Sequence, residues 1–251
     1  MSTALWLYYN DGMFYFDEIN NKKILKSDLI ENALFTTRET CIKSKDENLI
    51  PFTLQNREEL KNYLKIQKLI YPNQTHSANI ETADFYKDFY KETDALILTD
   101  KRLGIFLNFA DCTPIVLFDK TQNIGAIAHA GWRGTVAKIG PKTALKMRED
   151  YGCKIEDISA LIGPCISKCC FEVGFEVYEK LCESVNTPPA YPKSEKVFAD
   201  LKEINRIQLE QVGIKNIDIC PYCTVCDNDK FFSYRKENGT HNRHSAVLWL
   251  N

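Results

Sequence analysis

Four short apolar runs in the middle of the chain constrain the fold more than any other feature of the sequence. Each run is rich in β-branched and aliphatic residues, and short polar segments separate one run from the next. These connections are too short to hold the helical crossover that parallel neighbouring strands require. The sequence therefore predicts that this part of the sheet is largely antiparallel, with strands at Ala95 to Leu98, Gly104 to Phe109, Thr113 to Phe118 and Ile124 to Ala128.

The rest of the chain predicts helices and strands in mixed order. At the start, Ala4 to Tyr9 and Met13 to Phe16 flank a turn tripeptide, which predicts a hairpin. Apolar periodicity predicts helices at Asn56 to Ile66, Val136 to Tyr151, Val173 to Val185 and Ala199 to Val212, and strands at Leu69 to Tyr71, Ile158 to Ile162, Ile217 to Ile219 and Ala246 to Leu250. Gly140-Pro141 must kink the helix that contains it or delay its start. We expect one α+β domain over residues 1–251, with mixed, mostly antiparallel sheets flanked by helices in a layered α/β/β/α arrangement.

Length and composition indicate an ordinary soluble protein. The 251 residues are enough for a sizeable core, and a formal net charge of −2 gives no reason to expect binding to nucleic acid or an anionic membrane. No segment approaches the roughly 18 consecutive apolar residues of a membrane helix, and the first residues lack the basic start and cleavage site of a signal peptide. We therefore expect a cytoplasmic protein that is a monomer or a weak homo-oligomer.

Ten cysteines raise the question of disulfides or metal. In a chain of this length with no export signal, thiols or metal ligands are favoured over a disulfide framework. Two overlapping Cys-x-x-Cys pairs are formed by Cys220, Cys223 and Cys226, and Cys165, Cys169 and Cys170 could complete a site. The spacing of the second group matches no standard motif, so buried free thiols are the favoured interpretation and a second metal site stays open.

The chemistry of the chain is concentrated in Ala110-Asp111-Cys112 and in the segment from His129 to Gly134. Together with His76, one of only four histidines, Cys112 and His129 make a three-ligand set of the kind that catalytic zinc uses, with the fourth position left for water or substrate. Spacing alone does not show that the three residues converge. Two alternatives therefore stay open. The residues could be ordinary core residues whose hydrogen bonds are satisfied, or Cys112 could be a nucleophile with His129 as its base.

Further polar residues flank this candidate set. Asp111 could be a general base, could orient a ligand imidazole or could hold a turn, and it shares a pocket with Cys112 only if the strand ends there. The segment Gly131-Trp132-Arg133-Gly134 precedes a helix, so its backbone N–H groups and guanidinium suit a phosphate or carboxylate. Arg235 and Arg243 could clamp an anion or could pair with surface carboxylates.

Taken together, the motifs resemble the YfiH-like laccase-domain family, whose members are also called multicopper polyphenol oxidases, peptidoglycan editing factors or purine nucleoside phosphorylases. The matching segments are QTH at 74–76, TDALIL at 93–98, ADCTPIVLFD at 110–119, IGAIAHAGWRGT at 124–135, ALIGPCISKCCFEVG at 160–174 and FFSYR at 231–235. The resemblance implies a single-domain enzyme in which His76, Cys112 and His129 hold Zn²⁺. It also implies phosphorolysis of adenosine, inosine and methylthioadenosine, and hydrolytic deamination of adenosine, with purine nucleoside and phosphate as substrates.

The resemblance also implies roles for the residues around the metal. In the mechanism that we expect, Asp111, Cys112 and Arg133 are catalytic, and Gly131, Trp132, Gly134, Arg235 and Arg243 help to bind nucleoside and phosphate.

The chain departs from the family at Asn242, where glycine is usual, at Phe171, where tyrosine is usual, and at Gly140-Pro141. Copper binding in vitro is compatible with the ligands, but four histidines are too few for multicopper reduction of oxygen. A Cys/His hydrolase, a structural zinc domain closed by His241 or His244, and an editing factor for peptidoglycan precursors are the remaining alternatives.

Overall fold

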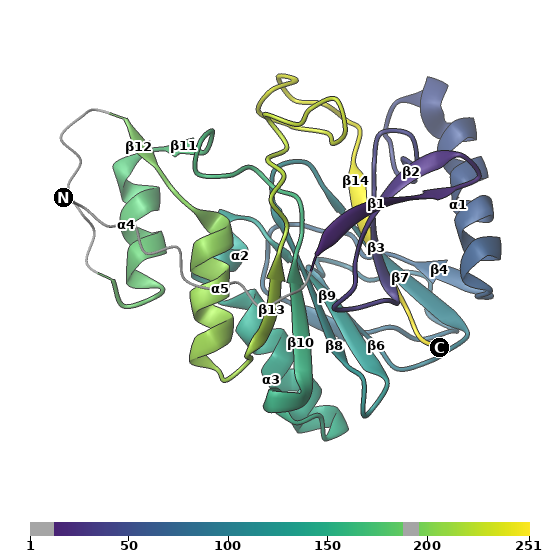
Figure 1. Ribbon diagram of the computed structural model, residues 1–251, viewed down its shortest axis with the longest axis horizontal. Coiled ribbons are helices and arrows are strands. Elements are labelled where there is room, and N and C mark those ends of the chain that lie inside the picture. The colour runs from purple at the N-terminus through teal and green to yellow at the C-terminus, as the bar shows by residue number, and fades with distance from the viewer. Residues whose placement is uncertain (1–12, 188–195) are drawn as a thin grey trace.

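The computed structural model describes residues 13–187 and 196–251 and contains two large sheets with helices on their outer sides (Figure 1). The first sheet has the order β1–β2–β3–β14–β7–β4, with β1 at Phe14–Ile19, β2 at Lys22–Ser27, β3 at Ala33–Thr36, β14 at His244–Trp249, β7 at Leu103–Phe109 and β4 at Lys68–Ile70. The second sheet has the order β13–β10–β8–β9–β6–β5, with β13 at Asn216–Ile219, β10 at Ile158–Ile162, β8 at Thr113–Asp119, β9 at Ile124–Ala130, β6 at Ala95–Leu98 and β5 at Ile80–Thr82. Two short strands, β11 (Glu172–Val173) and β12 (Val197–Phe198), pair separately.

The four middle strands are present, but they belong to two sheets rather than one. β8 pairs antiparallel with β9, and β9 with β6, as the short connections predict. β7 instead lies in the first sheet between β14 and β4. Every residue of β6 and β8 is buried, because the second sheet is covered on both faces.

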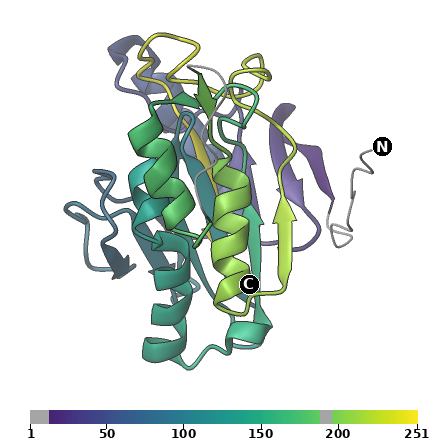
Figure 2. The ribbon, with the colours of Figure 1, turned by 90° about the vertical axis from the view of Figure 1, so that its left-hand side faces the viewer.

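Three apolar clusters define the layers. The largest contains side chains of both sheets, such as Leu107 and Val116, and fills the space between them. A second cluster packs β6, β8 and β9 against α3 (Ile139–Tyr151) and α5 (Leu201–Gln211). A third packs the outer face of the first sheet against α1 (Ile50–Leu64). The molecule is therefore a mixed α/β fold of the expected α/β/β/α type, with α1 on one side and α3 and α5 on the other (Figures 1 and 2).

Each of the four predicted helical segments contains a helix, although α1 begins at Ile50 rather than at Asn56. The segment after β9 forms two helices, α2 (Trp132–Val136) and α3, and Pro141 lies in the first turn of α3, where a missing N–H costs nothing. The fourth helix, α4, covers Phe175–Glu183. No helix within 13–187 and 196–251 is long and apolar enough to cross a membrane.

The predicted N-terminal hairpin falls partly outside the described residues, since Ala4 to Tyr9 lie within 1–12. The described hairpin joins β1 to β2 instead, around Asn20 and Asn21. Both asparagines have a positive φ, 50° and 61°, which a two-residue hairpin turn of this hand requires.

Candidate metal and nucleoside site

The pairing register of β8 and β9 brings Cys112 next to the end of β9. Thr113 is paired with Ala130 and Pro114 with His129, so Cys112, just before β8, lies beside Gly131, just after β9. A Cβ added to Gly131 would be 2.8 Å from Cys112 Sγ. The close approach of the two segments therefore requires a glycine at this position.

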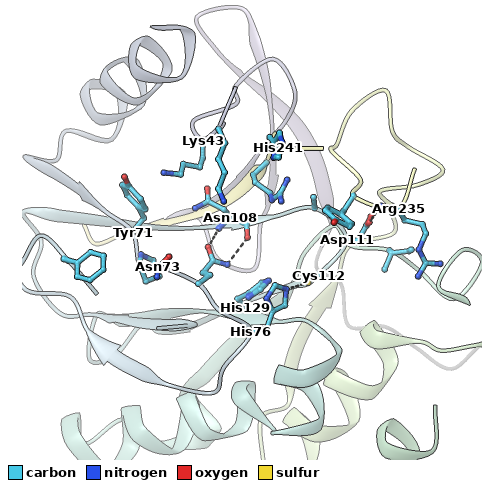
Figure 3. A pocket seen from close by; sticks show the side chains of 18 of the residues that line it. Lys43, Tyr71, Asn73, His76, Asn108, Asp111, Cys112, His129, Arg235 and His241 are labelled. Carbon is cyan, nitrogen blue, oxygen red and sulfur yellow. Dashed lines mark hydrogen bonds between the residues drawn. The ribbon is translucent and has the colours of Figure 1, made fainter. Parts of the chain in front are cut away.

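The third residue, His76, comes from the loop between β4 and β5. Its Nε2 lies 3.7 Å from Cys112 Sγ, and the ring centroids of His76 and His129 are 4.8 Å apart. One nitrogen of each imidazole and the sulfur all lie within 4.8 Å of one another. In a tetrahedral zinc site, a sulfur and a nitrogen ligand are about 3.5 Å apart. The three side chains that the sequence singles out therefore converge in a geometry that fits a metal ion (Figure 3).

A buried carboxylate, Asp94, organises this group. Its Oδ1 lies 2.8 Å from His129 Nδ1, which directs the other ring nitrogen of His129 toward Cys112. The backbone N–H groups of Thr75, His76 and Ser77 also donate to Asp94. Burial raises the pKa of Asp94, but the hydrogen bonds from His129 and Ser77 more than offset this and lower it to about 2. One carboxylate therefore fixes the orientation of His129 and the position of the His76 loop.

Cys112 and His129 form a charged pair when no metal is bound. Although burial raises the pKa of the Cys112 thiol, the charge of His129 and hydrogen bonds from both imidazoles lower it overall. Conversely, burial lowers the pKa of His129, whereas Cys112 and Asp94 raise it. The sulfur is thus held as a thiolate, the form that binds a metal or acts as a nucleophile.

Replacing Asp94 with asparagine is expected to weaken zinc binding by about 10- to 100-fold, because partners that orient a ligand imidazole contribute that much to affinity. Competition with a chromophoric chelator measures the affinity. Asp88, an exposed carboxylate in the cavity wall that pairs with Lys68, provides the control: Asp88→Asn leaves the affinity unchanged. Wild-type affinity in Asp94→Asn would show that Asp94 does not orient His129 for a metal.

The three residues lie in the wall of a cavity of about 780 Å³, a size typical of small-molecule sites. Cationic side chains outnumber carboxylates in the lining, four to two; they are Lys43, Lys45, Arg235 and Arg243, against Asp88 and Asp111. Aromatic side chains also line the cavity, namely Tyr71, Phe89, Phe171 and Tyr234. Figure 3 shows Lys43 and His241 across the cavity from His76, Cys112 and His129. The cavity therefore combines a metal-binding group with features that suit an anionic and an aromatic ligand.

Asp111 and Cys112 both line this cavity, because β7 ends at Phe109 and the two residues lie in the loop before β8 rather than in a strand. Asp111 has a φ of 83°, an unusual backbone conformation for a residue other than glycine. Its carboxylate accepts hydrogen bonds from Thr224 Oγ1 at 2.6 Å and from the backbone N–H of Arg235 at 2.7 Å. Asp111 therefore ties the loop between β7 and β8 to the segment between β13 and β14, and this places Arg235 at the cavity.

The glycine-containing turn lies differently from the expected phosphate loop. None of the four residues from Gly131 to Gly134 is among those that line the cavity. The side chain of Trp132 packs in an apolar cluster with Ile166 and Phe171, and Arg133 stacks on Trp132 at 4.2 Å from ring centroid to guanidinium carbon. Gly131 contributes instead by leaving room for Cys112 and His76.

Neither remaining histidine joins the metal-binding group. His244 is fully buried between the rings of Phe109 and Phe231, and burial lowers its pKa to about 3. His241 lines the cavity but lies outside the group of converging ligand atoms. Among the described residues the group therefore offers three ligands, and a fourth position would face the cavity.

Sequence reasoning did not identify several residues of this site. Asp94 stands immediately before a fully buried strand, which is the signal that could have indicated a functional carboxylate. Gln74 exchanges two hydrogen bonds with the backbone of Asn108 and so joins the His76 loop to β7. Lys43, Tyr71 and Asn108 reach the cavity from three separate segments, and no sequence spacing relates them.

Comparison with known proteins agrees with this architecture. Residues 35–251 match the family described as multi-copper polyphenol oxidoreductase laccase. A purine nucleoside phosphorylase of Bacteroides thetaiotaomicron is 36% identical over 185 residues, covering 68% of each chain. Adenosine deaminase RL5, from an unknown prokaryotic organism, is 33% identical over 186 residues, 68% of this chain and 71% of that protein.

A solved structure shows the same fold. The Bacillus licheniformis hypothetical protein YfiH superposes with a TM-score of 0.81 at 28% identity, covering 94% of this chain and 99% of that one. The matched family covers His76, Cys112 and His129. The chain therefore belongs to the laccase-domain, or YfiH, family, in which relatives are named as purine nucleoside phosphorylases and as an adenosine deaminase.

Proposed function

We propose that this protein is a zinc-dependent purine nucleoside phosphorylase that also deaminates adenosine. The single observation that carries the proposal is the convergence of His76, Cys112 and His129 at the wall of a cavity lined by cations and aromatic rings. A three-ligand group is typical of catalytic zinc, whereas structural sites are usually closed by four protein ligands. The names of the relatives supply the substrate class.

The cavity offers a place for each substrate. The guanidinium of Arg243 donates to the carbonyl oxygens of Thr240 and Asn242, which hold it at the cavity wall. We assign the phosphate to Arg243, Arg235 and Lys43, because these cations line the cavity and Arg133 does not. The purine ring would stack on the exposed aromatic rings, Phe89 and Tyr234.

The two proposed reactions break different bonds. In phosphorolysis a phosphate oxygen forms a bond to the ribose C1′, the bond from C1′ to the purine nitrogen breaks, and the base leaves with a proton. In deamination water adds to the purine C6 and ammonia leaves. Zinc with an open position supplies Lewis-acid chemistry and lowers the pKa of a bound water to about 7.

The residues of the chain supply binding, orientation and charge. Asp94 holds His129, and Asp111 holds the loop that carries Arg235. Both oxygens of Asp111 already accept hydrogen bonds, so we assign it a positioning role before any role in moving a proton. The cations screen the negative charge of phosphate as it approaches the ribose.

The direct test is to incubate the zinc-loaded protein with adenosine, and in separate reactions with inosine and with methylthioadenosine, each with and without phosphate, and to separate adenine, inosine and hypoxanthine. Adenine that forms only with phosphate, together with inosine in both conditions, supports the proposal. Absence of turnover of adenosine, inosine and methylthioadenosine would overturn it.

Replacing Arg243 with alanine is expected to raise the KM for phosphate by roughly 10- to 100-fold, since a hydrogen bond to a charged group contributes about 1.5–3 kcal/mol. Arg133→Ala is the matched control, because this arginine is exposed and lies outside the cavity lining. Steady-state kinetics with varied phosphate measures both. A large rise in the KM for phosphate in Arg133→Ala, with no change in Arg243→Ala, would instead place the phosphate at the turn from Gly131 to Gly134.

A second candidate function is a cysteine hydrolase, and one observation favours it. Cys112, His129 and Asp94 form the order of nucleophile, base and orienting carboxylate found in such enzymes. His76 beside the same sulfur favours the metal, since a nucleophile needs no second imidazole. A covalent acyl adduct on Cys112, detected by mass spectrometry of the metal-free protein, would support the hydrolase.

A further inference from the structure

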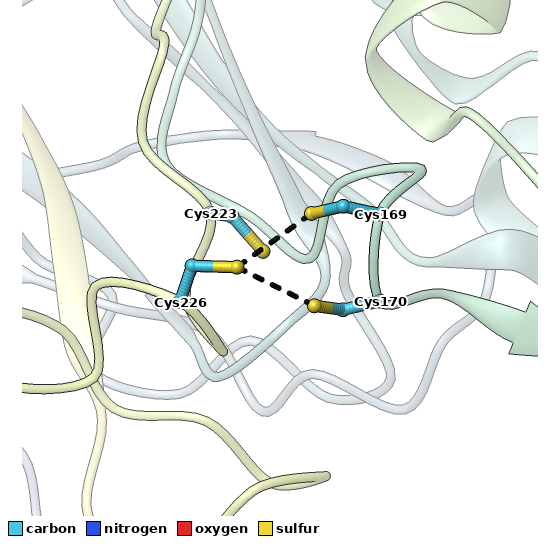
Figure 4. A group of neighbouring side chains, drawn as sticks. All are labelled: Cys169, Cys170, Cys223 and Cys226. Carbon is cyan, nitrogen blue, oxygen red and sulfur yellow. Dashed lines mark hydrogen bonds between the residues drawn. The ribbon is translucent and has the colours of Figure 1, made fainter.

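A second group of cysteines converges outside the nucleoside site. Cys169, Cys170, Cys223 and Cys226 have their four sulfur atoms within 4.8 Å of one another. Figure 4 shows the sulfurs turned toward a common centre. Cys223 is buried, but Cys169 and Cys226 are exposed, which corrects the expectation of buried thiols for these two residues. Cys165 and Cys220 are buried thiols, as that expectation states, and lie outside the group.

We propose that these four cysteines bind a structural zinc ion that fastens together two loops of the cavity wall. In a tetrahedral site with Zn–S bonds of about 2.3 Å, neighbouring sulfurs lie about 3.8 Å apart. The observed distances from Cys226 Sγ are 3.7 Å to Cys169 Sγ and 3.5 Å to Cys170 Sγ. Four thiolates close the coordination shell, which is typical of structural zinc rather than catalytic zinc.

The fold explains how an irregular spacing produces this group. Cys169 and Cys170 follow β10, Cys223 and Cys226 follow β13, and these two strands are parallel neighbours. Their loops therefore leave the same end of the sheet. An isolated parallel β-bridge between the backbones of Cys165 and Cys223 keeps the two loops side by side. The backbone N–H of Ser167 donates to Cys223 Sγ at 3.4 Å, a contact that stabilises a thiolate in a metal site.

The alternatives fit the geometry less well. None of the four cysteines forms a disulfide. A cluster of several iron atoms would have to lie between the sulfurs and hold them further apart than a single ion does. Tetrahedral coordination by four thiolates in a mononuclear site therefore favours zinc.

The two loops that the four cysteines join also form part of the wall of the cavity. Thr224, between Cys223 and Cys226, donates to Asp111, and the backbone N–H of Ile166 donates to the Asp111 carbonyl. The same two loops carry Phe171 and Arg235 to the cavity wall. A metal ion between the loops would hold this wall in place without contacting a substrate.

The test is the zinc content of the purified protein and of three variants, measured by elemental analysis after dialysis. We expect two zinc ions per chain in the wild type, one in Cys226→Ser, one in Cys112→Ala and two in Cys182→Ala, a control for loss of a cysteine from α4. Cys226 is exposed, so the serine variant is expected to keep the fold, which circular dichroism checks.

X-ray absorption at the zinc edge of the Cys112→Ala protein tests the ligands independently of any other substitution. Four sulfurs at about 2.3 Å are expected. A single zinc per wild-type chain that is lost in Cys112→Ala would overturn the proposal. So would unchanged zinc content in Cys226→Ser, iron at this site, or a disulfide among the four cysteines.

Discussion

Replacing Cys112 with alanine is expected to remove the metal from the nucleoside site and to abolish phosphorolysis of adenosine. The thiolate is the one anionic ligand of the three, and the remaining imidazoles lose the partner that holds them together. Loss of a Lewis acid costs several kcal/mol of transition-state stabilisation, so kcat/KM falls by about 1,000-fold or more. Zinc content and the rate of adenine release measure the two effects.

His76→Ala and His129→Ala are expected to give the same result, since each removes one ligand of the same group. Cys182→Ala provides the control, because this thiol lies in α4, away from both cysteine-containing groups. Full activity of a Cys112→Ala protein without metal would refute the assignment of Cys112 as a ligand in a zinc-dependent reaction.

Replacing Gly131 with alanine is expected to reduce zinc affinity by about 10- to 100-fold, although Gly131 offers no ligand atom. The added Cβ would lie 2.8 Å from Cys112 Sγ and 3.1 Å from His76 Cδ2, so both ligands must move. The backbone itself accepts alanine, since φ is −64° and ψ is 173°. Any loss of zinc affinity in Gly131→Ala therefore results from the crowding of the two ligands by the added Cβ.

Gly174→Ala is the matched control for this variant. Gly174 is also the residue before a helix, with φ of −67° and ψ of 154°, but a Cβ there meets nothing within 4 Å. Any loss of stability that comes from alanine at the residue before a helix is the same in both variants. Equal zinc affinities for Gly131→Ala and Gly174→Ala would contradict the close packing of Gly131 on the ligands.

The elements of the fold are predictable because they depend on local patterns. β10 has the predicted bounds, Ile158–Ile162, and α3 starts late because of Pro141. The assignment of strands to sheets is not predictable in this way, because alternation and apolarity report burial but not the partner strand. β7 and β8 are adjacent in sequence and, apart from the half-buried Asn108 of β7, both are fully buried, yet they lie in different sheets.

The same difference applies to the sites. The residue types of His76, Cys112 and His129 suggest a metal, but only the register of β8 with β9 and the hydrogen bonds of Asp94 bring them together. The cluster of four thiols arises from two loops that parallel strands place side by side. The spacing Cys223-x-x-Cys226 is a standard one but the adjacent pair Cys169-Cys170 is not, so the spacing names the candidate cysteines and leaves a second metal site open.

The ³¹P magnetic resonance spectrum of a reaction with adenosine and phosphate tests the central claim most directly. We predict that inorganic phosphate falls while a ribose phosphate ester rises in an amount equal to adenine and hypoxanthine together, and that neither change occurs with Cys112→Ala. Release of adenine while the phosphate signal stays constant would show hydrolysis instead and would contradict the account.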